Sequence, residues 1–133
     1  MIPILALVAL TALPQLAPAA AADAPNPAVI DAAKQFLALV DQSRWDDSYR
    51  ATGAAFRKLN TEQVWATTSE KVRVPLGAVA SRTFVSEEEL PAPPAGYEVV
   101  KFRTDYVNKA GAVETVSLER EGGVWRVVGI TIG

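Results

Sequence analysis

The 133-residue sequence contains neither cysteine nor histidine. Without cysteine, the chain forms no disulfide, offers no thiolate to zinc and carries no N-terminal cysteine for lipid attachment. Without histidine, it lacks the commonest general base and the commonest transition-metal ligand of proteins. These absences exclude histidine-activated hydrolase triads and the usual zinc centres. We therefore expect no cofactor, no metal and no enzymatic activity.

The sequence also lacks a long block of charge of either sign. Its 13 basic and 15 acidic side chains leave a net charge of −2. Binding to nucleic acid requires a basic stripe that neutralises several phosphates, so we expect no nucleic-acid partner. The run Glu87-Glu88-Glu89 does not have the spaced, glycine-bent ligand pattern of a calcium loop, and we interpret it as a solvated strand end or loop.

Charge is absent altogether from residues 1–22, MIPILALVALTALPQLAPAAAA, which end in small side chains. This pattern is typical of a secretory signal peptide with its cleavage site, here placed after Ala22. The alternative is an uncleaved membrane anchor, but Pro14 and Pro18 interrupt the apolar stretch. We expect a bacterial periplasmic or secreted protein with no stable membrane span after cleavage, a leader at 23–27 and a single domain at 28–133.

Three helices are expected in the first half of that domain. Asn26-Pro27 is a good helix start, and apolar residues at helical spacing continue to about Asp41. A second, short helix is predicted from Arg44 to about Ala51 with Ser43 as its cap. A third is predicted to open with Asn60 as its cap and to end near 74, because Pro75 follows.

The second half is predicted to be a sheet of four antiparallel strands, the first at 78–85. Gly122-Gly123 is a typical two-residue hairpin loop, which places Leu118 opposite Val127 and Glu114 opposite Thr131. A three-residue loop at 109–111 places Phe102 opposite Leu118. The expected fold class is therefore α+β, with three N-terminal helices packed on a curved four-stranded antiparallel meander. The core is expected to contain Phe36, Leu37, Trp65, Phe102, Leu118, Trp125 and Val127.

Three segments carry a family resemblance: WDDSYRATGAAFR, VRVPLGAVASRT and the run from Gly96 to Ile132. Together they resemble the bacterial exported family known only as domain of unknown function 4019. That resemblance implies export but no activity and no catalytic residue. The order of helices and strands is also similar to the cone-shaped nuclear-transport-factor-two/cystatin-like architecture, which hosts enzymes, ligand binders and interaction modules alike.

The first candidate site is an interface. In the predicted register, Val107, Val113, Ile130 and Ile132 gather on the outer face of the sheet, where a single-layer sheet meets water. Such a patch favours a non-catalytic binding or protein-interaction module, with a homodimer or a periplasmic protein as partner. The alternative is that the chain's own leader, or curvature at a β-bulge, covers the patch.

The second candidate site is a small-ligand pocket or an active site on the helix-facing side of the sheet. Thr104, Tyr106, Glu114 and Thr131 share that face in the predicted register, beside the space left by Gly129. A carboxylate among hydroxyl groups can act as a general acid or base when its pKa is raised. The alternative is that Glu114 is simply solvated at a frayed strand end.

Overall fold

The computed structural model describes residues 25–92 and 96–133, so the predicted signal peptide and the first two residues of the leader lie outside the described residues. Within these described ranges, four α-helices and a short 3-10 turn precede four strands. The helices are α1 (Pro27–Asp41), α2 (Trp45–Arg50), α3 (Ala54–Leu59) and α4 (Glu62–Arg73), followed by η2 (Val74–Leu76). The strands are β1 (Val79–Leu90), β2 (Tyr97–Tyr106), β3 (Lys109–Glu121) and β4 (Val124–Ile132).

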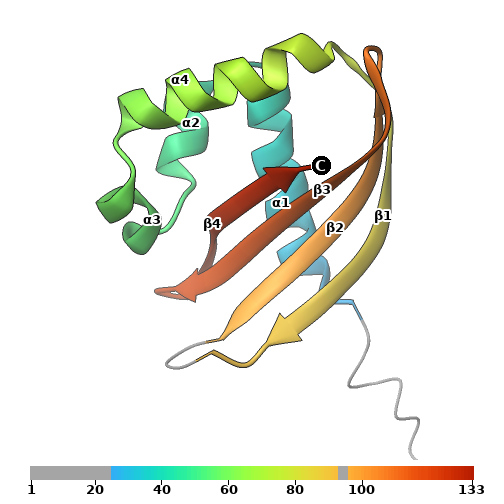
Figure 1. Cartoon of the computed structure of the whole chain (residues 1–133). Coiled ribbons are helices and arrows are strands. Elements are labelled where there is room, and N and C mark those ends of the chain that lie inside the picture. The colour runs from blue at the N-terminus through green and yellow to red at the C-terminus, as the bar shows by residue number, and fades with distance from the viewer. Residues whose placement is uncertain (1–24, 93–95) are drawn as a thin grey trace, which may run out of the picture.

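The strands form one antiparallel sheet in the order β1-β2-β3-β4, which confirms the predicted α+β meander. The sheet curves strongly, α1 crosses one of its faces, and α4 lies across the end at which β2 turns into β3 (Figure 1). We call the face that α1 covers the inner face and the opposite one the outer face. In the described residues, no helix is both long and apolar enough to cross a membrane.

The helix starts were predicted with mixed success. The Asn26 side chain caps α1 as expected, accepting a hydrogen bond from the Ala28 amide at 3.1 Å. Ser43, however, does not cap α2, and its φ of 56° lies in the left-handed region. The cap of α4 is Thr61 rather than Asn60, because the Thr61 hydroxyl accepts from the Val64 amide.

Helix α3 was not predicted, so the described part of the chain has four α-helices where three were expected. It begins after Gly53, whose amide donates to the Val127 carbonyl at 2.8 Å. The Glu121 carboxylate also accepts from the Ala54 amide at 3.0 Å. A side chain at Gly53 would begin 3.0 Å from Val128 Cγ1, so glycine permits the close approach. These contacts hold α3 beside β4.

The predicted register fails beyond Leu118. Leu118 faces Val127 as expected, but the ladder then shifts, so that Ser117 pairs with Gly129 and Glu114 with Ile132. The extra residue is a β-bulge at Val128. Because side chains alternate with period two, one inserted residue transfers every later side chain of β4 to the opposite face.

The β2–β3 connection also differs from the prediction. The turn lies at Val107-Asn108, and Phe102 consequently pairs with Glu114 rather than with Leu118. Gly111 does adopt a positive φ, 68°, but it does so within β3 beside a register shift. Its amide donates to the Asp105 side chain at 2.7 Å. Strand β1 is longer than expected and includes Glu87-Glu88-Glu89.

The core lies between α1 and the inner face of the sheet. Helix α1 contributes five buried side chains: Val29, Ala33, Phe36, Leu37 and Val40. The sheet contributes Val100, Phe102, Val116, Leu118 and Val127. Six of the seven predicted core residues are buried, and Trp125 is only partly buried. Burying one such aliphatic or aromatic side chain stabilises a fold by about 1.5–3 kcal/mol.

Candidate functional site

A buried polar network occupies the inner face at the end covered by α4. Its centre is Glu114 on β3, whose side chain is only 1% exposed. Arg82 on β1 donates to it through two nitrogens, Nε to Oε1 at 2.7 Å and Nη2 to Oε2 at 2.8 Å. The hydroxyls of Thr104 and Tyr106 on β2 donate to Oε1 and Oε2 respectively. The carboxylate thus accepts four hydrogen bonds.

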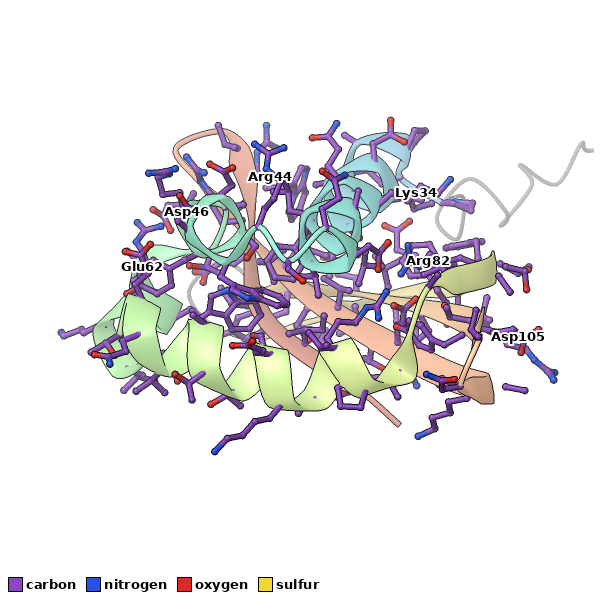
Figure 2. All side chains as sticks on the ribbon, turned by 90° about the horizontal axis from the view of Figure 1, so that it is seen from above. Lys34, Arg44, Asp46, Glu62, Arg82 and Asp105 are labelled. Atoms are coloured by element: carbon purple, nitrogen blue, oxygen red, sulfur yellow. The ribbon has the colours of Figure 1, made fainter. Side chains whose placement is uncertain are left out.

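Arg82 links this carboxylate to the C-terminal ends of two helices. It donates to both oxygens of Asp41, at the end of α1, at 2.8 and 3.0 Å. Arg73, at the end of α4, also donates to Asp41 and donates to the Gly77 carbonyl at 2.6 Å. Figure 2 shows Arg82 in the space between α1 and α4. We call Asp41, Arg73, Arg82, Thr104, Tyr106 and Glu114 the inner network.

The network is electrically balanced, because two guanidinium groups face two carboxylates. Burial disfavours the charge on Arg82, but the hydrogen bonds from this side chain to Glu114 and Asp41 outweigh it and raise the pKa of Arg82. Burial and the hydrogen bond to Glu114 raise the pKa of Tyr106. Tyr106 also lies under Arg73, whose guanidinium carbon is 4.6 Å from the ring centroid. Arg82 therefore stays charged and Tyr106 stays a neutral donor around neutral pH.

Few polar groups of the inner network are free to react with a substrate. Each oxygen of Glu114 already accepts two hydrogen bonds, so neither oxygen has a lone pair free for a substrate. No buried side-chain nitrogen or oxygen of the described residues lacks a partner. Within the same residues, no three carboxylates converge as metal ligands. The arrangement suits a structural clamp that joins three strands to the ends of α1 and α4.

Three of the four predicted pocket residues, Thr104, Tyr106 and Glu114, do come together in this network. The fourth, Thr131, does not: it pairs with Thr115 and is exposed, because the bulge at Val128 moves it to the outer face. Glu114 is also not solvated, which removes the alternative of a frayed strand end. Whether these residues hold a ligand stays a prediction.

Sequence reasoning missed Asp41, Arg73 and Arg82. One sequence signal for Arg82 was available. Arg82 and Phe84 are two residues apart, so they share the face of β1 that packs inward. An arginine on a buried strand face requires a carboxylate partner. No sequence signal identified Asp41 and Arg73, because helix ends far apart in the chain meet only in the folded molecule.

The predicted interface residues separate onto different surfaces. Val113 is 43% exposed and pairs with Arg103, and Val107 is 68% exposed in the β2–β3 turn. Ile130 and Ile132 instead line a crevice of about 100 Å³ with Val40, Trp65, Thr68, Ser69 and Val72. The predicted continuous patch of four residues is therefore wrong, because it relied on the register without the bulge.

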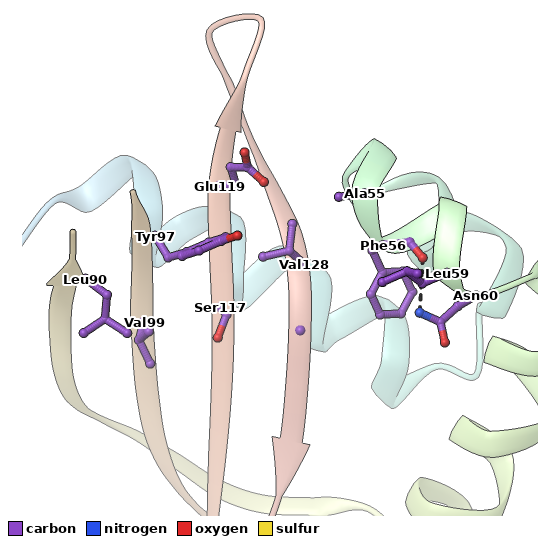
Figure 3. A pocket seen from close by; sticks show the side chains of 11 residues that line it. Ala55, Phe56, Leu59, Asn60, Leu90, Tyr97, Val99, Ser117, Glu119 and Val128 are labelled. Carbon is purple, nitrogen blue, oxygen red and sulfur yellow. Dashed lines mark hydrogen bonds between the residues drawn. The ribbon is translucent and has the colours of Figure 1, made fainter. Parts of the chain in front are cut away.

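A larger apolar surface exists on the outer face, at the other end of the sheet. It is a hollow of about 450 Å³ between α3 and the strands (Figure 3). We call it the outer hollow. It is lined by Ala55, Phe56, Leu59, Asn60, Leu90, Tyr97, Val99, Ser117, Glu119, Val128 and Gly129. Sites for small molecules and for anchoring side chains have volumes in this range.

Small residues form the floor of the outer hollow. Ser117 and Gly129 pair across β3 and β4, and a side chain added at Gly129 would meet only Ser117 within 4 Å. Leu90 and Tyr97 form one wall, with 47% and 37% of their surface exposed. Leu59 of α3 stands on the opposite rim and is 85% exposed. Exposed apolar groups gathered around a depression are typical of a binding surface.

A comparison with protein-family models places this chain in a family. Residues 32–130 match the model described as "Protein of unknown function (DUF4019)". No curated protein matches the sequence. The match begins within α1 and ends within β4, and it includes every residue of the inner network and of the outer hollow. The chain therefore belongs to the DUF4019 family of proteins of unknown function.

Proposed function

We propose that this protein is an exported, non-catalytic binding module that acts through the outer face of its sheet. The observation that carries the proposal is the outer hollow, an open apolar depression of about 450 Å³ beside a leucine that is 85% exposed. A surface of this kind costs solubility unless another molecule covers it. The hydrophobic effect supplies the affinity, and the shape of the hollow supplies selectivity.

The inner network supports the same proposal, because its chemistry argues against catalysis. Its central carboxylate is saturated by four donors, and the chain has no histidine or cysteine to pair with it. General base catalysis needs a group within reach of a substrate proton and free to accept it. The polar interior therefore stabilises the fold, and the outer face does the binding.

A photo-reactive phenylalanine derivative at Tyr97 tests this function in cells that express the whole sequence. We expect a covalent product that disappears in Ser117→Leu, because leucine fills the floor of the outer hollow. Thr115→Leu is the matched control, since Thr115 lies two residues away on the same face but outside the hollow. Absence of any product, or equal loss in both variants, would overturn the proposal.

The proposal that the protein is exported rests on residues 1–22. Mass spectrometry of the periplasmic fraction tests this proposal. We expect a chain that begins at Asp23, since small residues before that position suit signal peptidase. An intact chain that begins at Met1 and stays in the inner membrane would contradict export. That result would leave the role of the outer hollow untouched.

The second candidate function is a small-ligand pocket or enzyme around Glu114 and Tyr106. One observation favours it: a hollow of about 300 Å³ borders the inner network at Asp41, Ser43, Arg73, Val74, Gly77 and Ala78. A ligand bound there raises the melting temperature by mass action. A thermal shift from a small molecule that is abolished in Glu114→Gln, but retained in Ser117→Leu, would favour this function over the first.

A further inference from the structure

We infer that the outer hollow is covered by a second copy of this chain, packed outer face to outer face about a two-fold axis. The inference rests on the proposed function, which assigns binding to this face, and it names the partner. Such a contact is isologous: the same surface of both copies takes part, and a residue on one side of the hollow meets residues from the opposite side of the partner's hollow. Two observations support a self-complementary arrangement.

The first observation is the arrangement of apolar groups. Leu59 stands on the α3 side of the outer hollow, while Leu90 and Tyr97 stand on the β1–β2 side (Figure 3). A two-fold axis through the hollow brings Leu59 of each copy onto Leu90 and Tyr97 of the other. The small floor residues Ser117 and Gly129 leave room for these side chains. Both copies thus bury their exposed apolar groups in the same contact.

The second observation is charge. Helix α3 is basic in its last turn, where Lys58 is exposed next to Leu59. On the opposite side of the hollow, Glu88 is exposed and pairs with Val99, a lining residue. The two-fold axis that joins Leu59 to Leu90 also brings Lys58 of one copy near Glu88 of the other. Opposite charges then meet twice, once on each side of the axis.

Sedimentation equilibrium of the processed protein, purified from cells that express the full sequence, tests the inference by charge exchange. We expect a dimer that Lys58→Glu or Glu88→Lys weakens about tenfold, because each reversal creates two like-charge contacts. The double variant Lys58→Glu/Glu88→Lys restores dimerisation, since the pairs re-form with opposite signs. Both side chains are exposed, so neither change threatens folding.

Leu59→Glu supplies a second test, because it places an unpaired charge in the apolar contact and abolishes the dimer. The matched control is Val64→Glu, at an exposed apolar position on α4 outside the hollow, which leaves the dimer intact. A wild-type monomer at all concentrations, or a double variant no better than the singles, would overturn the inference.

A wild-type monomer whose position 97 still cross-links to a different protein would refute the second copy but uphold the proposed function. A monomer that gives no cross-link would refute both.

Discussion

Replacing Glu114 with glutamine is expected to destabilise the protein by about 3–5 kcal/mol, the range found when a buried ion pair loses one partner. Glutamine keeps the shape of the side chain but replaces one oxygen with an NH₂ group. The hydroxyls of Thr104 and Tyr106 can rotate to accept from that group, whereas Arg82 has only donors. One N–H of Arg82 is therefore left without an acceptor, and two guanidinium groups share the single carboxylate of Asp41.

Urea denaturation measures this loss as a lower midpoint at an unchanged slope. Because a small domain has a total stability of only about 5–15 kcal/mol, the expected loss is a large share of it. The matched control is Glu70→Gln on the exposed surface of α4, which should change stability by no more than about 0.5 kcal/mol. A loss below about 1 kcal/mol for Glu114→Gln would refute the network as described.

Three further predictions concern the fold. Phe102→Ala should cost about 3–5 kcal/mol in the free energy of unfolding, because the ring is fully buried, and a loss below about 1 kcal/mol would mean that it lies outside the core. Thr61→Ala should lower stability in urea by about 1 kcal/mol through loss of the α4 cap, and a neutral result would show that the cap contributes nothing. Partial burial and the nearby charges of Glu87 and Glu89 raise the pKa of Glu98 to about 6. Its protonated form is therefore favoured in the folded state, so its contribution is full below about pH 4.5 and is lost as the pH rises through 6. Glu98→Gln should flatten the stability profile in that window and raise stability at pH 7, and an unchanged profile would contradict the raised pKa.

The sequence pattern was sufficient for the layer arrangement and for most of the core. Apolar residues at helical spacing identified α1, and Gly122-Gly123 identified the β3–β4 hairpin, because those signals are local. The register of β4 was not predictable by counting from that hairpin. No particular residue type marks the bulge at Val128 in the sequence. The bulge nevertheless moves Thr131 to the outer face and Ile132 to the inner face.

The candidate sites, too, could be predicted from the sequence only where the signal was local. Thr104, Tyr106 and Glu114 were assigned to one face from strand alternation, and they do meet. Their cationic partner Arg82 and the helix-end residue Asp41 join them only through tertiary packing. The outer hollow was missed because α3 is too short to give a periodic signal, having only six residues. Its position beside β4 depends on contacts of Gly53 and Glu121 across the chain.

Disulfide cross-linking tests most directly the claim that the outer face binds a second copy. The chain has no cysteine, so single substitutions give unambiguous products. Copies carrying Leu59→Cys are mixed with copies carrying Leu90→Cys under mild oxidation, after which the mass of the products is measured. We expect a covalent dimer of one copy of each kind, in clear excess over a mixture of Val64→Cys with Leu90→Cys copies. A yield no greater than that of the control mixture would contradict it.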